Sequence, residues 1–244
     1  DVVFTTPVIY PNPTQSVLNI LGNSTQFEVV VFTVTGQKML EAKMVNQIKA
    51  TYIDHCGSDL TTVNAARVSF GKKSHWEFEA LQEGLLEKDA KLIRYLAKHK
   101  HLSPFGHAFA SFHVKAPIFV ARQLVKHKFL RWNEISRRYV DDEPEFYVPD
   151  VWRGRSADKK QGSEGEAHLN EYQQNLIKGA VGACFATYHN IIRSGVAPEQ
   201  ARSILPQGTM TEWYWSGSLD AFASMCVLRL KDDTQYETRL VAQQ

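Results

Sequence analysis

The segment at residues 126–139, KHKFLRWNEISRRY, constrains the fold more than any other because it mixes cations with large apolar side chains. It contains five Lys or Arg residues, one His and a single carboxylate, Glu134. Four apolar residues interleave with these charges, so the segment cannot be wholly solvated: Phe129, Leu130, Trp132 and Ile135. A basic cluster held against a core can present guanidinium, ammonium and backbone N–H groups to a phosphate. We therefore expect a local pocket for a small anionic ligand here.

The overall charge makes any basic site a local one. The chain of 244 residues carries a formal net charge of only +2, and its hydrophobic content of 43% can supply a core for one large domain or two modest ones. Three cysteines lie far apart without a CxxC pair, and we interpret them as reduced residues: Cys56, Cys184 and Cys226. Neither a run of 18 apolar residues nor a signal peptide is found, so we expect no membrane span, no membrane partner and a cytoplasmic location.

The chain divides into two regions that differ in composition and in the spacing of their apolar residues. Residues 1–47 are β-rich, with strands expected at 17–21 and 27–34, and are too short to bury a core of their own. In the region at 48–244, helical spacing and terminus signals predict five helices and alternation predicts one strand. The helices are expected at 81–98, 116–128, 168–195, 218–230 with Ser218 as cap, and briefly from Pro198; the strand is expected at 109–115.

The C-terminal end predicts a short helix. The sequence TQYE at 234–237 has the form of a capping box, so a new helix should begin there. It has only about two turns before Gln244, and a helix that short is marginal on its own. We expect either that the domain lacks its final helix or that a partner holds this end.

Two other interpretations of the basic segment compete with a ligand pocket, and a third alternative concerns the histidines of the chain. It can be a solvated surface, or a nucleic-acid-binding module in which Phe129 and Trp132 stack on bases, although the net charge of +2 argues against the latter. A metal hydrolase built from some of the nine histidines is disfavoured because no HExxH or similar ligand spacing occurs.

The segment KHKFLRWNEIS is similar to the signature of the flavin-dependent thymidylate synthases, which reads Arg-His-Arg, seven residues and then Ser. Here it reads Lys126-His127-Lys128, residues 129–135 and Ser136, and the likeness continues through Arg138-Tyr139. Four further segments resemble the family in the same order: DLTTVNAARVSFGK, HLSPFGHAFASFHVKAPIFVARQ, SGVAPEQARSILP and the helix ending at Arg229. The resemblance covers residues 48–244. It implies an α+β fold of mixed helices with an antiparallel sheet, preceded here by the short β-rich segment.

The resemblance implies an enzyme that methylates dUMP to dTMP. Family members take the carbon from methylenetetrahydrofolate and reducing equivalents from NADPH through FAD, so dUMP and folate are implied partners and FAD the implied cofactor. The flavin carries the redox step, while the protein supplies binding, orientation and charge. A homotetramer with sites shared between subunits is also implied, with no nucleic-acid partner. The alternatives are a nucleic-acid-binding module without catalysis and a truncated, inactive family member.

Matching positions assign the site residues by resemblance. Arg229 corresponds to the family arginine that polarises the uracil ring of dUMP and favours its ionised N3; a fixed cation stabilises negative charge that develops there. The implied dUMP contacts are Gln123, Lys126, Glu134, Ser136, Arg138, Arg202 and Arg229. The implied FAD contacts are Ser69, His101, Ser103, Lys126, His127, Lys128, Glu134, Ser218 and Ser224. No metal site is implied.

The chain departs from the family pattern in several places. Lys126 and Lys128 replace Arg, which keeps the charge but loses the planar, two-pronged donor geometry. Ser218 and Ser224 stand where better-known members carry Asn. The first 47 residues lie outside the pattern: YPNPTQSVLNI followed by VVVFTVTGQKML resembles the C-terminal sorting tail of Bacteroidetes secreted proteins. Such a tail works at a C-terminus, so we infer no secretion from it.

Overall fold

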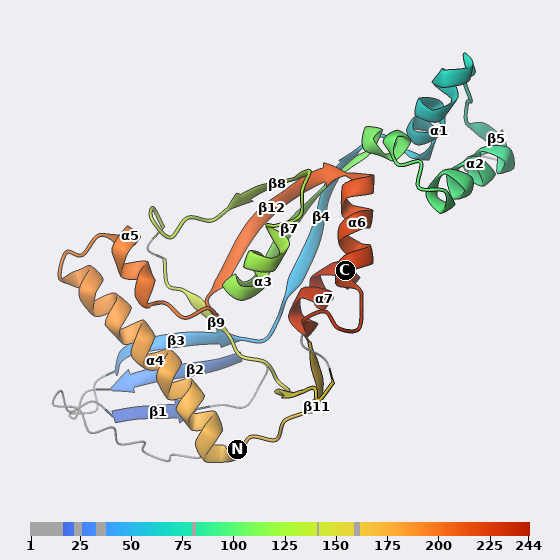
Figure 1. Cartoon of the computed structure of the whole chain (residues 1–244). Helices are drawn as coiled ribbons and strands as arrows, with labels where there is room; N and C mark the ends of the chain where they lie inside the picture. The colour runs from blue at the N-terminus through green and yellow to red at the C-terminus, as the bar shows by residue number, and fades with distance from the viewer. Residues whose placement is uncertain (1–16, 22–25, 33–37, 80–81, 141, 159–161) are drawn as a thin grey trace.

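The computed structural model describes residues 17–21, 26–32, 38–79, 82–140, 142–158 and 162–244 (Figure 1). The strands are β1 (Val17–Leu21), β2 (Gln26–Phe32), β3 (Lys38–Val45), β4 (Lys49–Cys56), β5 (Glu77–Glu79), β6 (Gln82–Gly84), β7 (Phe109–Pro117), β8 (Leu130–Glu134), β9 (Glu145–Tyr147), β10 (Arg153–Arg155), β11 (Ser163–Glu166) and β12 (Met210–Ser218). The α-helices are α1 (Asp59–Arg67), α2 (Glu87–Lys98), α3 (Ile118–Leu124), α4 (Glu171–Arg193), α5 (Pro198–Ala201), α6 (Leu219–Arg229) and α7 (Tyr236–Gln243). Three short 3₁₀ helices complete the set: η1 (Val68–Phe70), η2 (Ser103–His107) and η3 (Arg202–Ile204).

An antiparallel sheet of order β4-β7-β12-β8 forms the centre of the molecule. Because side chains alternate along a strand, β12 directs Trp213 and Trp215 into the core, whereas Tyr214 between them is exposed. Trp132 of β8 stacks on Trp213 with ring centroids 4.3 Å apart. Helices α3, α6 and α7 pack on this core and on one another. The confirmed fold class is therefore mixed helices with an antiparallel sheet.

A second sheet has the order β1-β2-β3-β9 and joins the N-terminal segment to the rest of the chain. Strand β3 runs parallel to β9, and α4 lies against β2 and β3 (Figure 1). Met44 of β3 is fully buried in a small cluster with Phe146 of β9 and Phe185 of α4. Lys43 adds an ion pair to Glu145. The predicted strand at 17–21 is confirmed as β1; the strand predicted at 27–34 is found as β2, with residues 33–34 outside the described part.

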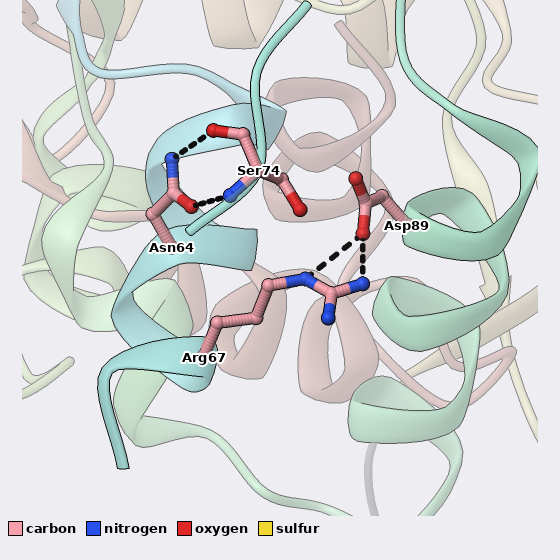
Figure 2. A network of polar contacts seen from close by, with 4 residues as sticks. All are labelled: Asn64, Arg67, Ser74 and Asp89. Atoms are coloured by element: carbon pink, nitrogen blue, oxygen red, sulfur yellow. Dashed lines mark hydrogen bonds and ion pairs between the residues drawn. The ribbon is translucent and has the colours of Figure 1, made fainter. Parts of the chain in front are cut away.

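Helices α1 and α2 project from the central sheet and are held together by a polar network (Figures 1 and 2). Arg67, the last residue of α1, donates from Nε to Oδ1 of Asp89 at 3.0 Å, and Asp89 is fully buried. The Asn64 amide donates to the carbonyl of Ser74 at 3.1 Å and accepts from its backbone N–H at 2.7 Å. These contacts fix both ends of the turn at 68–74, which carries the predicted flavin contact Ser69.

The structure confirms several predicted elements and corrects others. The strand at 109–115 is β7, and the helices at 168–195 and 218–230 are α4 and α6. The helix expected at 81–98 begins only at Glu87 because residues 82–84 pair with β5 as strand β6. The helix expected at 116–128 ends at Leu124. Beyond it, the basic segment turns through Phe129, which has φ 66°, and continues as strand β8.

The structure confirms one predicted cap position and corrects the other. Ser218 occupies the N-cap position of α6, but its side chain makes no capping hydrogen bond. The N-cap of α7 is Gln235 rather than Thr234, because the Thr234 hydroxyl donates instead to the carbonyl of Leu228 at 3.2 Å. Helix α7 itself is present, and it packs against α3 and α6 of the same chain.

Candidate active site

Arg229, the predicted catalytic residue, is held in place by the end of helix α3. It is the last residue of α6. Its Nε donates to Nε2 of His127 at 2.9 Å, and its Nη2 donates to the carbonyl oxygen of Gln123 at 3.0 Å. A guanidinium has five N–H donors, so these bonds fix its plane and leave donors for a ligand.

Gln123 is itself oriented by a residue of the C-terminal segment. Its amide Nε2 donates to Oε1 of Gln235, the residue that caps α7. Gln123 is partly buried, and its neighbours Ala121 and Leu124 lie in the core. The end of α3 and the turn that follows it therefore present Gln123 and His127 from a rigid support.

Gln123, Arg229 and Gln235 open onto a cavity of about 930 Å³. Four cationic side chains line it: Lys126, Arg153, Arg229 and Lys231. Within the described residues, none of the four forms an ion pair with a carboxylate of the chain, although Asp233 and Glu237 also line the cavity. A cavity of this size is in the upper range for small-molecule sites. Its unpaired cations suit an anionic ligand.

Two neutral groups, the Tyr147 phenol on the cavity wall and the Cys226 thiol on α6, accompany these charges. Burial, assisted by the charges of Glu237 and Asp150, raises the pKa of Tyr147 on the cavity wall well above its usual value, so the phenol stays protonated. Burial likewise raises the pKa of the Cys226 thiol, about one turn before Arg229 on α6. A protonated thiol is a poor nucleophile, so Cys226 is not suited to covalent catalysis.

Glu134, predicted to contact both dUMP and FAD, is engaged within the chain. Both of its oxygens lie 3.0 Å from Nη2 of Arg122. It also accepts from Nε1 of Trp132 at 3.1 Å and from the Thr211 hydroxyl at 2.8 Å. The carboxylate is thus fixed on the sheet at the end of β8, and it is not among the residues that line the cavity.

Three other predicted dUMP contacts lie outside the cavity of the single chain: Ser136, Arg138 and Arg202. The hydroxyl of Ser136 accepts from the backbone N–H of Arg138 at 3.3 Å, and the Arg138 guanidinium lies over the ring of Tyr139. Arg202 is exposed, and its Nε donates to the carbonyl of Glu199 at 3.2 Å. One chain therefore brings together Gln123, Lys126 and Arg229, but not the whole predicted set.

The predicted flavin contacts are spread along α6. His127 touches Arg229 at the C-terminal end, with exposed Lys126 and Lys128 beside it in the sequence. Ser218 is at the N-terminal end, where η2, which carries Ser103, packs on α6. At 1.5 Å per residue, the eleven-residue helix separates these ends by about 16 Å.

Of the remaining predicted flavin residues, Ser103 is at the N-terminal end of α6, and Ser224 is at the middle of this helix. Ser69, His101 and Ser103 are all exposed, and Ser69 stands between two apolar side chains, Val68 and Phe70, that are 71% and 78% exposed. Ser224 is also exposed and donates to the carbonyl of Asp220 at 2.8 Å. Exposed polar groups beside uncovered apolar ones suit contact with a flat, partly apolar molecule or with another subunit.

Comparison with known proteins identifies the family. A family model described as "Thymidylate synthase complementing protein" matches residues 51–244. The chain belongs to the flavin-dependent thymidylate synthase family. It is 40% identical over 190 residues to the flavin-dependent thymidylate synthase of Thermus thermophilus, covering 78% of this chain and 67% of that one. With the enzyme of the same name from Thermosipho melanesiensis it shares 36% identity over 205 residues, covering 83% and 86%.

A solved structure agrees with this flavin-dependent thymidylate synthase family assignment. The UMP/dUMP methylase PolB from Streptomyces cacaoi, bound with 5-Br dUMP, matches with a TM-score of 0.69 at 31% identity, covering 82% of this chain and 89% of that one. The predicted family, and with it the prediction of an enzyme of this class, is confirmed. A second family model, a secretion system C-terminal sorting domain, matches residues 8–58, which agrees with the resemblance of the N-terminal segment.

Some site features were not predicted from the sequence. Gln235, Tyr147 and Arg153 line the cavity, and only Gln235 lies in a segment that the sequence singled out, the TQYE stretch. Among the described residues, no group of three or more His, Cys, Asp or Glu is placed to hold a metal ion. In the same part of the chain, no helix is long and apolar enough to cross a membrane.

Proposed function

We propose that this flavin-dependent thymidylate synthase family member converts dUMP to dTMP, with FAD as cofactor, methylenetetrahydrofolate as carbon donor and NADPH as reductant. The observation that carries the proposal is the fixed guanidinium of Arg229 on the wall of a cavity with unpaired cations. The relatives' name, flavin-dependent thymidylate synthase, and the dUMP analogue bound to PolB support it.

Arg229 would act on the uracil ring. Burial lowers the pKa of Arg229 somewhat, but a guanidinium remains protonated at neutral pH. A cation that is already oriented stabilises negative charge developing on the ring without reorganising during the reaction. Gln123 and Lys126, on the same wall, would bind the polar and anionic parts of the nucleotide.

The described residues fit a bound flavin at the level of their chemistry. Lys126 and Lys128 are exposed cations that can meet its diphosphate, and Ser69, His101 and Ser103 are exposed polar groups beside apolar Val68 and Phe70. When bound, FAD supplies the electron pair, drawn from NADPH, that turns the transferred methylene into a methyl group. The chain's own contribution is binding, orientation and charge.

We further propose that the full site combines residues from several subunits of a tetramer. Ser136, Arg138 and Arg202 lie outside the cavity that Arg229 lines, and the end of α6 that His127 contacts is about 16 Å from the end at Ser218. A second copy of the chain can bring such groups to one ligand. The cytoplasmic location stays a prediction.

The test is a reconstituted assay with the full chain. Purified protein loaded with FAD should form dTMP from dUMP when methylenetetrahydrofolate and NADPH are both present, and should lose this activity when either is omitted. UMP is assayed as a second acceptor in place of dUMP, because the similar PolB is a UMP/dUMP methylase. Binding of FAD and dUMP without any dTMP would indicate an inactive family member. Activity without added or bound flavin would overturn the proposal.

A further inference from the structure

The contact between His127 and Arg229 suggests a role for His127 that differs from the flavin contact implied by resemblance. The Nε of Arg229 carries one hydrogen and can only donate. Nε2 of His127, 2.9 Å away, must therefore accept through its lone pair. The geometry requires a neutral imidazole with its hydrogen on Nδ1.

We propose that His127 is a positioning residue for Arg229: its neutral imidazole accepts from Nε and, together with the Gln123 carbonyl, aims the guanidinium into the cavity. This inference rests on the proposed function for its effect on turnover, but the hydrogen bond itself does not. Its neighbours in the sequence, Lys126 and Lys128, have exposed side chains. Of these three residues, His127 makes the contact with Arg229.

The support of His127 makes it suitable for this task. Its backbone N–H donates to the carbonyl of Leu124 at 3.1 Å, which continues the end of α3 as a turn, and Leu124 is fully buried. The imidazole is only partly exposed. The Gln123 carbonyl belongs to the same turn, so both acceptors of Arg229 move as one unit.

The electrostatic surroundings favour the neutral form that the geometry requires. Burial lowers the pKa of His127, and the positive charge of Arg229 lowers it further. The charged group that acts on His127 is Arg229 of α6, with Lys126 and Lys128 on either side in the chain. Lys231, Asp233 and Glu237 line the cavity that Arg229 also lines. Protonation of His127 would remove the acceptor and place a second cation against Arg229. The orientation of Arg229 should therefore be lost as the pH falls through the lowered pKa.

Two substitutions at His127 separate positioning from flavin binding. His127→Phe keeps a ring but removes the acceptor. We expect kcat for dTMP formation to fall about 10²-fold, because the Arg229 guanidinium is then misplaced relative to the reacting uracil ring. His127→Gln places an amide oxygen near the site of Nε2 and does not titrate. It should recover most of the lost kcat, and its rate should no longer fall at acidic pH. The FAD content of both variants should match that of the wild type.

A histidine that faces a carboxylate instead of Arg229 provides the matched control. The control is His113→Gln on β7, where the imidazole faces Glu212 at 3.1 Å. Its kcat should still fall at acidic pH, as in the wild type. Equal loss of kcat in His127→Phe and His127→Gln, together with loss of bound FAD, would make His127 a flavin contact and overturn the proposal. The proposal would also be overturned if kcat of His127→Gln still fell at acidic pH.

A measurement without turnover distinguishes failure of this inference from failure of the proposed function. Nitrogen NMR of the full chain with labelled histidine reports which ring nitrogen of His127 carries the hydrogen. We expect Nδ1 to be protonated and Nε2 to be an acceptor that responds to Arg229→Ala. This result would stand even if the chain formed no dTMP. Protonation at Nε2 would contradict the proposal regardless of activity.

Discussion

Arg229 depends on two acceptors for its position, His127 Nε2 and the Gln123 carbonyl, and the sequence could predict only part of this arrangement. The resemblance named Arg229, Gln123 and His127, but it assigned each to a ligand. That they contact one another follows from the packing of the ends of α3 and α6, which no local pattern encodes. Glu134 shows the same limit, since its bond to Thr211 spans 77 residues.

Arg229→Ala tests the role of this guanidinium in turnover. We expect dTMP formation to fall by about 10²-fold or more, because an oriented charge at the reacting ring is removed. Bound FAD should be largely retained, since the predicted flavin residues are spread over other elements. The comparison is a steady-state assay beside a flavin absorbance measurement, with exposed Arg131→Ala of β8 as the control. Full turnover in the Arg229 variant would remove it from the catalytic role.

A second partly buried histidine, His189 on α4, should make stability depend on pH. Burial lowers its pKa, the negative charge of Glu143 raises it, and the positive charge of Arg193 lowers it further. In the window between the lowered folded value and the unfolded value of about 6.5, the unfolded chain binds more protons. The free energy of unfolding should therefore fall as the pH drops through the unfolded value of about 6.5 towards the lowered folded value.

His189→Phe should reduce this acid loss of stability. The imidazole packs edge-on against Phe185, and its buried Nε2 has no hydrogen-bond partner in the described chain, so a phenyl ring suits the position. Urea unfolding at several pH values measures the slope, and exposed His168→Gln is the control. A slope unchanged by His189→Phe would show that other groups cause the dependence.

Among the helices and strands, periodicity and turn chemistry located the long helices and β7, but they missed two strands of the central sheet, β8 and β12. Strands β8 and β12 do show alternation, with Trp213 and Trp215 buried on either side of exposed Tyr214. The basic charges around β8 obscured this signal. The opposite error occurred at 82–84, where helical spacing continued into a segment whose backbone pairs with β5. Pairing with another strand decided both cases.

Asp89→Ala tests the polar network that joins α1 and α2. Asp89 is fully buried and is the ion-pair partner of Arg67, so its loss leaves a largely buried guanidinium without a counter-charge. Breaking such a pair typically costs about 3–5 kcal/mol. We expect hydrogen exchange of the α1 amides and of the turn at 68–74 to accelerate strongly. Arg94→Ala, which breaks an exposed pair with Glu87, should cost less than about 1 kcal/mol. Equal exchange in both variants would mean that the buried pair does not stabilise this unit.

In the molecule as a whole, the N-terminal segment is packed into the fold despite its resemblance to a separate sorting domain. The two family models overlap at residues 51–58, largely within β4 of the central sheet. Strand β3 pairs with β9, and β9 leads into the cavity wall at Tyr147. The sequence predicted the β-rich character of this segment, but not its parallel pairing with a strand about 100 residues later.

Met44→Ala tests whether β3 contributes to stability. Met44 is fully buried against Phe146 and Phe185, and truncating a buried Met costs about 2–5 kcal/mol through lost burial and a cavity. We expect a matching fall in the free energy of unfolding by urea titration, whereas exposed Gln47→Ala should change it little. Indistinguishable unfolding curves for the two variants would show that β3 is not packed as described.

The proposed site is tested most directly by the visible absorption spectrum of the FAD-loaded chain during titration with dUMP. In that site a pyrimidine nucleotide lies beside the flavin, within reach of Arg229. We therefore expect a saturable perturbation of the flavin band that is strongly weakened in Arg229→Ala. A protein that cannot be loaded with FAD, or a flavin spectrum that does not respond to saturating dUMP, would contradict the proposed site.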